Sequence, residues 1–348
     1  MTSFGDLVGM VSHNPFLALV LVLVMGTIFV NGATDAANAI AEPIGTRAID
    51  VDSAIIMSVI TNFIGLVGMT MFSTAVADTM SNMVDFGGDN HAALIALAAA
   101  TVAIVSWSSL AWVFGIPTSE SHALIAGLTG AALAVHGGFQ AVNGAEWIKV
   151  IYGLVLSTVL GFVAAWAIAK VIPYLCRNVD RRRANDFFAK MQVWAAAGAS
   201  AMHGAQDGQK FMSTAMLAIT LSQGMSIADA TFPFWLEFAC AAIMAIGTGI
   251  GGKPIIKKVG IDMVQLEQYQ GFAAALSATG ALLLATLTGL PVSTTHTSSS
   301  SMMGAGAAKD PRSVDWGVAK EVVLTWVFTF PGCGLIGFLL AKLFLLVF

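Results

Sequence analysis

Residues 30–39 read VNGATDAANA, and they directly follow an apolar run that begins at Phe16. A carboxylate inside the hydrocarbon core of a bilayer costs roughly 2.5–3.5 kcal/mol on insertion scales, so Asp35 is expected to have a function. Residues 202–210, MHGAQDGQK, repeat the Gly-Ala-polar-Asp core and place Asp207 172 residues after Asp35. The sequence therefore predicts a membrane protein with two equivalent polar sites.

The composition places the chain among polytopic membrane proteins. Hydrophobic residues make up 57% and charged residues 10% of the sequence, whereas a soluble globular chain carries about 25% charged residues. Cys176, Cys240 and Cys333 have no CxxC spacing, so neither a disulfide framework nor a zinc site is expected. No Lys or Arg precedes the first apolar run, which argues against a cleaved signal peptide. The expected surroundings are a lipid bilayer, and no nucleic-acid partner is expected.

Apolar segments of membrane-spanning length follow one another along the whole chain. A transmembrane helix needs ~20 predominantly apolar residues. Ten segments approach this length, at about 16–41, 53–77, 91–114, 118–137, 147–172, 192–222, 232–250, 268–288, 291–308 and 317–347. The predicted fold class is all-α.

Two pairs of motifs relate the first five segments to the last five. Residues 32–35 (GATD) match residues 204–207 (GAQD), and residues 115–122 (GIPTSESH) match residues 289–296 (GLPVSTTH). The offsets are 172 and 174 residues, so the two halves are predicted to descend from one unit. The predicted organisation is an extracytoplasmic segment at 1–15, a first membrane repeat at 16–172, an Arg-rich cytoplasmic linker at 173–191 and a second membrane repeat at 192–348.

The orientation of the halves follows from segment number and charge. Five segments per half is an odd number, so the second half is predicted to be inverted relative to the first, as in many secondary transporters. With the N-terminus outside, the inner loops hold Arg47, Arg181–Arg183 and Lys309, and the outer loops hold Asp85 and Asp89. This distribution satisfies the positive-inside rule. We therefore expect a multi-pass protein of a prokaryotic plasma membrane with both termini extracytoplasmic.

The third and fourth segments of each half are either two full spans or one re-entrant hairpin. We favour a hairpin whose tip lies near Pro117–His122 in the first half and Pro291–His296 in the second. Ser and Thr around a Pro are typical of a helix start, because Pro suits the first turn and the hydroxyls cap free N–H groups. Broken backbone at that depth is tolerated only where it is buried or lines a cavity. The two tips are expected to meet near the membrane midplane.

The hydroxyl clusters are the predicted anion site. Each cluster opens a helix after Gly-x-Pro, and free N–H groups with hydroxyls at a helix N-terminus bind anions. The alternative is that these hydroxyls only bond to backbone carbonyls of their own helix. The candidate substrate-binding residues are Thr118, Ser119, Ser121, Ser293, Thr294 and Thr295, together with Lys210.

Asp35 and Asp207 are predicted to bind the coupling cation, although either could instead cap a broken helix. Glu120 lies inside the first hydroxyl motif, where a negative charge opposes anion binding unless the carboxyl is protonated or holds a cation. Lys210 could pair with an aspartate or approach the anion, and its first-half equivalent is Asn38. His122, His203 and His296 could fix a neighbour or handle protons.

Ser, His and Asp together also allow a hydrolase reading. No strand-turn-helix elbow accompanies them, and a duplicated motif favours binding over catalysis, so the chain is not expected to be an enzyme. An anion channel is a further alternative, but it would show a ring of charge or a filter.

The combination of motifs resembles the inorganic phosphate transporter (PiT) family. The resemblance rests on GATDAAN in the first half, HGAQDGQK in the second and the paired Pro-x-Ser-x-Ser/Thr-His motifs, and it covers residues 16–347. It implies a homodimeric, cation-coupled symporter in which broken helices bearing Asp35 and Asp207 and the two Pro-x-Ser motifs hold phosphate. It also implies Na⁺ at Asp35 and Asp207, with no other cofactor. The residues that match the family's motif positions are Asp35, Asn38, Asp207, Ser119, Ser121, Ser293, Thr294 and Thr295.

One departure from the family pattern affects the coupling ion. The family commonly has Asn before each signature Asp, where this chain has Thr34 and Gln206. Hydroxyl and amide oxygens still coordinate cations. The change nevertheless leaves the coupling ion open between Na⁺, H⁺ and a cation–phosphate complex. Gln209 is predicted to support the site. The predicted function is Na⁺- or H⁺-coupled symport of inorganic phosphate, with sulfate or another oxyanion as the alternative substrate.

Overall fold

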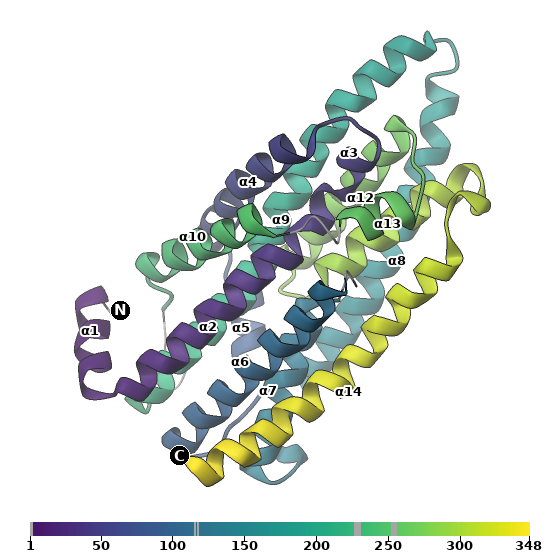
Figure 1. Cartoon of the computed structure of the whole chain (residues 1–348). Helices are drawn as coiled ribbons and strands as arrows, with labels where there is room; N and C mark the ends of the chain where they lie inside the picture. Colours follow the sequence, from purple (N-terminus) through teal and green to yellow (C-terminus); the bar gives the residue numbers. More distant parts are fainter. Residues whose placement is uncertain (1–2, 115, 117, 226–230, 252–255) are drawn as a thin grey trace.

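The chain is built of helices, as the sequence predicts. The computed structural model describes residues 3–114, 116, 118–225, 231–251 and 256–348 (Figure 1). Within these residues, six helices are long and apolar enough to cross a membrane. They are Pro15–Gly45, Val51–Phe72, Asn90–Val113, Gly144–Leu175, Gln268–Leu287 and Trp316–Val347.

The first half consists of long helices joined by short helical segments. In chain order they are α1 (Phe4–His13), α2 (Pro15–Thr34), η1 (Ala36–Ile40), α3 (Ala41–Gly45), α4 (Val51–Phe72), α5 (Ala75–Ser81), α6 (Asn90–Val113), α7 (Glu120–His136), η2 (Phe139–Ala141) and α8 (Gly144–Leu175).

The second half repeats this order from a longer first helix. Its elements are α9 (Arg181–Gln223), α10 (Phe234–Ile250), η4 (Lys258–Asp262), α12 (Gln268–Leu287), α13 (Thr294–Lys309), η5 (Pro311–Ser313) and α14 (Trp316–Val347). The segment 173–191, expected to be a linker, is largely helical because α8 continues to Leu175 and α9 begins at Arg181. The arginine run forms the first turn of α9, where the Asp180 side chain accepts bonds from the backbone N–H groups of Arg182 and Arg183.

The packing of the helices recurs with the two halves exchanged. Helix α7 packs on α14 and α13 packs on α8, while α4 packs on α9 and α10 packs on α2. Two isolated β-bridges recur in the same way, Val84 with Val142 and Val264 with Val314. This repetition is what a duplicated unit predicts. The inverted orientation of the halves in the membrane stays a prediction.

Both termini lie at one end of the helix bundle. The rings of Phe16, near the start of α2, and Phe348, at the end of the chain, are 5.8 Å apart, and Figure 1 shows the C-terminus beside the start of α2. At the other end, Arg181 and Lys309 line one cavity, and Lys309 forms an ion pair with Glu267. The basic loops therefore gather at the end away from the termini, as the charge pattern predicts.

The chain reverses direction after α6 and again after α12, each time about halfway along the bundle. Near the end of α6, Trp107 donates a hydrogen bond to Thr329, in the middle of α14. In the second half, Leu290 and Val292 lie against Gly153 of α8. The helices that follow, α7 and α13, begin at these depths, as the re-entrant hairpins require. Pro117, at the predicted first tip, lies outside the described residues.

Glycines allow the helices beneath the polar centre to approach closely. A methyl group added to Gly65 of α4 would collide with the carbonyl oxygen of Ala201 in α9. A methyl group on Gly204 of α9 would collide in the same way with the carbonyl of Asn62 in α4. Small residues at such positions let membrane helices pack backbone to backbone. This contact holds α9 at the depth where Asp207 meets the hairpin tips.

Candidate functional site

The first polar stretch breaks its helix, as predicted. Helix α2 ends at Thr34, Asp35 is its C-cap, and residues Ala36–Ile40 continue as a 3₁₀-helix. Pro43 lies four residues after Ala39 and has no N–H to bond the Ala39 carbonyl, which disfavours a continuous α-helix here. The break turns the Asp35 side chain toward the hairpin tips.

The second polar stretch does not break its helix, so the expected second broken helix is wrong. Helix α9 runs without interruption from Arg181 to Gln223 and carries Asp207 on a regular turn. The position equivalent to Pro43, 172 residues later, is Ala215, which favours a helix. Gly204 and Gly208 are accommodated because each faces α4, at Asn62 and Leu66 respectively.

Each hydroxyl motif opens a helix, as predicted. Ser119 is the N-cap of α7, and its Oγ accepts a hydrogen bond from the backbone N–H of His122 at 3.3 Å. Ser293 is the N-cap of α13 and accepts from the N–H of His296 at 3.2 Å. The two N-termini bring free N–H groups and further hydroxyls to the middle of the bundle.

Asp207 is completely buried and accepts bonds from four elements. Lys210 Nζ lies 2.8 Å from its Oδ1, and His203 Nε2 lies 3.4 Å from its Oδ2. The hydrogen-bond donors besides Lys210 are Ser121 Oγ at 3.2 Å on Oδ1, with Thr294 Oγ1 at 3.1 Å and Asn31 Nδ2 at 3.2 Å on Oδ2.

Asp35 is equally buried but has only neutral donors. Thr295 Oγ1 donates to Asp35 Oδ1 at 2.8 Å, and Asn38 Nδ2 lies 3.4 Å from the same oxygen. The backbone N–H of Glu120, at the start of α7, donates to Oδ2 at 3.3 Å. Asn38 Nδ2 also donates to Thr295 Oγ1 at 3.2 Å.

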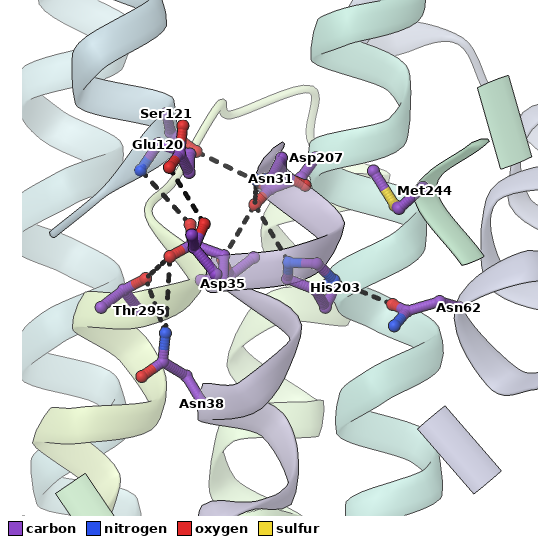
Figure 2. A network of polar contacts seen from close by, with 12 residues as sticks. Asn31, Asp35, Asn38, Asn62, Glu120, Ser121, His203, Asp207, Met244 and Thr295 are labelled. Carbon is purple, nitrogen blue, oxygen red and sulfur yellow. Dashed lines mark hydrogen bonds and ion pairs between the residues drawn. The ribbon is translucent and has the colours of Figure 1, made fainter. Parts of the chain in front are cut away.

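Glu120 adds a third carboxyl group to this centre. Its Oε1 accepts from Thr34 Oγ1 at 3.0 Å and its Oε2 from Ser108 Oγ at 2.7 Å. Figure 2 shows Asp35, Glu120 and Asp207 facing one small volume between α2, α7 and α9. Each aspartate binds a hydroxyl of the other half, Asp35 with Thr295 and Asp207 with Ser121. The centre is therefore formed where the two halves meet.

A cation-binding geometry is present among the described residues. One carboxylate oxygen each of Asp35 and Asp207 and a ring nitrogen of His203 lie within 4.8 Å of one another. Asn62 Oδ1 lies 2.8 Å from His203 Nδ1, which directs Nε2 toward Asp207 (Figure 2). Carboxylate oxygens suit a hard cation such as Na⁺. The two carboxylate oxygens therefore suit the predicted Na⁺, whereas the imidazole nitrogen is a ligand typical of transition metals.

Thr118 and the two predicted glutamines form hydrogen bonds outside the carboxylate network. Thr118 Oγ1 pairs with Thr329 Oγ1 of α14 at 3.0 Å. Gln206 Nε2 donates to the Leu290 carbonyl at 3.2 Å, and Gln209 Nε2 donates to the Ser73 carbonyl at 2.7 Å. All three anchor the hairpins or the end of α4 in this structure.

The two motif histidines face away from the aspartates. The rings of His122 and His296 are 4.3 Å apart and perpendicular. His296 stacks on Trp326 with ring centroids 3.6 Å apart, and His122 lies 4.4 Å from the Phe330 ring. Together these four residues line an apolar cavity of about 410 Å³ between α8 and α14. They fix the contact between the two hairpins and the long helices.

The structure adds three polar residues that sequence reasoning did not single out as ligands. Asn31 binds Asp207, Asn62 binds His203, and Ser108 binds Glu120. Asn31 is part of the first polar stretch, and Asn62 is an amide inside an apolar segment, which is a signal of function in a membrane helix. Ser108 carries no such signal, because hydroxyls are common in membrane helices.

Comparison with known proteins agrees with the geometry. A sequence profile of the phosphate transporter family matches residues 31–337. A "Probable low-affinity inorganic phosphate transporter" of Bacillus subtilis (strain 168) is 36% identical over 314 residues, covering 90% of this chain and 92% of the relative. One of the same name from Rhizobium meliloti (strain 1021) is 35% identical, covering 92% and 94%.

A solved structure shares the fold. It is described as "The sodium-dependent phosphate transporter" and matches with a TM-score of 0.85 at 22% identity, covering 96% of this chain and 100% of that one. The profile match and the identity to the bacterial relatives extend over both polar stretches and both hairpins. This chain belongs to the phosphate transporter family.

Proposed function

We propose that the protein carries inorganic phosphate across the plasma membrane by symport with a cation. The relatives from Bacillus subtilis and Rhizobium meliloti are named as low-affinity inorganic phosphate transporters, which supports phosphate as the substrate. The observation that carries the coupling is the buried charge at the meeting point of the two halves. This buried charge supports transport, rather than catalysis, at the duplicated site.

The charge balance requires a cation. Among the described residues of this centre, Asp35, Glu120 and Asp207 supply three carboxyl groups, and Lys210 supplies one ammonium. If these four groups are ionised and His203 is neutral, the net charge is −2 before phosphate enters. Buried charges of one sign without counter-ions are very costly. Cations or protons must therefore bind for the anion to bind, and by reciprocity phosphate tightens the cation site.

The hydroxyls at the hairpin tips are the proposed phosphate ligands. Thr294, Thr295 and Ser121 lie in the first turns of α13 and α7, next to the N-terminal N–H groups of those helices. Such N-termini favour anions. In this structure the three hydroxyls donate to the aspartates. In the proposed loaded state a cation neutralises Asp35, Lys210 neutralises Asp207, and the hydroxyls turn to phosphate.

Sodium and protons are both proposed as coupling ions. The structural neighbour's description as sodium-dependent supports Na⁺, and the two aspartates supply suitable oxygens. Glu120, hydrogen-bonded by Thr34 and Ser108, is the group that could instead carry a proton. The homodimer implied by the family resemblance stays a prediction.

Uptake by reconstituted vesicles tests the proposal. Purified protein in liposomes is given radiolabelled phosphate or sulfate under an inward gradient of Na⁺, of protons, or of neither. We expect phosphate to accumulate only under one of the cation gradients. Accumulation of sulfate instead would identify a different oxyanion, and gradient-independent flux of either anion would indicate a channel.

A further inference from the structure

We infer that Lys210 is a tethered cation that occupies one of two equivalent cation sites, so that the transporter moves one coupling ion fewer than its duplicated architecture provides for. The inference rests on the proposed cation coupling and deepens it. It concerns the number of ions bound, which can be measured without transport.

The ammonium of Lys210 occupies a site built of oxygens. Its Nζ lies 2.8 Å from Asp207 Oδ1 and 2.8 Å from Ser121 Oγ, and it also donates to the carbonyl oxygen of Val292. These oxygens come from α9, from α7 and from the loop that leads into α13. A carboxylate, a hydroxyl and a backbone carbonyl form the kind of donor set that binds hard metal cations. The lysine side chain is completely buried.

The contacts make Lys210 a counter-ion rather than a phosphate ligand. A lysine ammonium has three N–H donors. Each has an oxygen partner in the structure, Asp207, Ser121 or Val292. Phosphate could gain a bond from Lys210 only by taking one of these partners' places. A Na⁺ bound to the same three oxygens would likewise have to displace the ammonium.

The other half has the same arrangement without the built-in charge. Asp35 and Asn38 are three residues apart, as are Asp207 and Lys210, and each aspartate meets a hydroxyl at the equivalent position of the opposite hairpin. Thr295 donates to Asp35 at 2.8 Å, and Asn38 donates to Thr295 at 3.2 Å. The first half thus offers a carboxylate, a hydroxyl and a neutral amide. A positive charge there must come from solution.

A covalently attached cation cannot dissociate with phosphate. Lys210 therefore neutralises Asp207 in every state of the cycle, whereas the cation at Asp35 can bind and leave. An asparagine at position 210 would recreate the first-half pattern and free the oxygens of Asp207, Ser121 and Val292. The released site should then take a cation from solution.

The test compares four forms of the full-length purified protein in detergent: wild type, Lys210→Asn, Asn38→Lys, and the double exchange Asn38→Lys with Lys210→Asn. Equilibrium binding of ²²Na⁺ is measured per chain at fixed pH with choline as the replacing cation. We expect Lys210→Asn to bind one more Na⁺ than wild type, and Asn38→Lys one fewer. The double exchange should return to the wild-type number.

Uptake in liposomes gives a second readout. A tenfold reduction of Na⁺ below saturation should lower phosphate uptake by about tenfold in the wild type and by about a hundredfold in Lys210→Asn, because an extra ion must bind. If Lys210 had only a structural role, its replacement would lower uptake without changing how steeply uptake depends on the Na⁺ concentration. Lys210→Gln replaces the asparagine variant if the latter does not yield folded protein.

The outcomes separate the two claims. Equal ²²Na⁺ binding by wild type and Lys210→Asn, including no binding by either, would overturn the inference that Lys210 fills a Na⁺ site, whatever the protein transports. One additional ion in the variant, together with wild-type vesicles that carry no phosphate, would sustain the role of Lys210 and reject the proposed substrate.

Discussion

Asp35 and Asp207 are chemically identical, but the residues around them make them unequal. Asp207 Oδ1 bonds the ammonium of Lys210 at 2.8 Å, whereas Asp35 bonds Thr295, Asn38 and the N–H of Glu120, all neutral donors. Removing one member of a buried ion pair leaves an uncompensated charge, which costs about 3–5 kcal/mol. The same substitution at the two positions should therefore differ in its effect on stability.

We expect Asp35→Asn and Asp207→Asn both to abolish coupled phosphate uptake, because the amide keeps the shape but not the charge. Only Asp207→Asn should also destabilise the protein, by about 3–5 kcal/mol, since it strands the Lys210 ammonium. Thermal unfolding in detergent and vesicle uptake are the measurements. Normal uptake by either variant would make that carboxylate structural, and equal stability of the two would contradict the Lys210 pairing.

A second residue-scale prediction separates phosphate ligands from helix caps. Thr294→Ala should raise the half-saturating phosphate concentration by roughly tenfold to a hundredfold, because a hydrogen bond to a charged acceptor contributes about 1.5–3 kcal/mol. Ser119→Ala and Ser293→Ala should instead cost about 1 kcal/mol of stability each, because both serines are N-caps.

The matched control for these variants is Thr101→Ala. Its hydroxyl is buried but bonds only the carbonyl of Ala98 in the same helix, so phosphate affinity should not change. Uptake is measured over a range of phosphate at fixed Na⁺ and pH. If Thr294→Ala behaves like Thr101→Ala, the anion binds elsewhere than at the second hairpin tip.

At the scale of the helices, one proline and several glycines decide how the polar residues are presented. Pro43 accompanies the break that turns Asp35 toward the hairpins, and Ala215 at the equivalent position leaves α9 continuous. The glycine contacts between α4 and α9 then set the distance between those helices. Backbone carbonyls on both sides of this contact leave no room for a side chain.

Two glycines one turn apart on α4 test this account. Gly65→Ala should destabilise the protein by about 1–3 kcal/mol, because the methyl group collides with the Ala201 backbone and cannot be relieved by a rotamer change. Gly68→Ala, with no atom near the added methyl, should be neutral or stabilising by up to about 1 kcal/mol through helix propensity. The melting temperatures in detergent of the two variants should differ in this order. Equal values would mean that α4 and α9 separate easily.

At the scale of the whole molecule, the two ends of the bundle differ in charge. The termini lie together at one end, while Arg181, Lys309 and Glu267 gather at the other. The positive-inside rule assigns the basic end to the cytoplasm. With that orientation, the two hairpins are predicted to enter from opposite sides of the membrane and to meet at the aspartates, as expected for a transporter built of inverted repeats.

Chemical labelling of Cys176 tests this orientation. It is partly exposed at the basic end, whereas Cys240 and Cys333 are buried. A membrane-impermeant maleimide should therefore label inside-out vesicles but not intact cells, and Cys176→Ser should remove the labelling. In a Cys176→Ser background, Ser3→Cys should react in intact cells. Labelling of Cys176 from outside would reverse the assigned topology.

Much of the architecture is encoded in local sequence. Long apolar runs specify membrane helices because the bilayer admits little else, and the repeated motifs specify two related halves. Pro-x-Ser predicts the starts of α7 and α13, since a capping hydroxyl acts within three residues of its own position. Asp35 and Asp207 stand out because burial of a carboxylate in a membrane requires a reason.

The partners of those groups were decided only by tertiary structure. Asp35 meets Thr295 across 260 residues of sequence, and Asp207 meets Ser121 across 86. Lys210 could as well have approached an anion. Its ammonium is held by three oxygens that come together only because α7, α9 and the segment before α13 pack against one another. Spacing along a chain limits which side chains share a helix face, but it does not specify which helices will meet, and ion pairing depends on distances that only this packing determines.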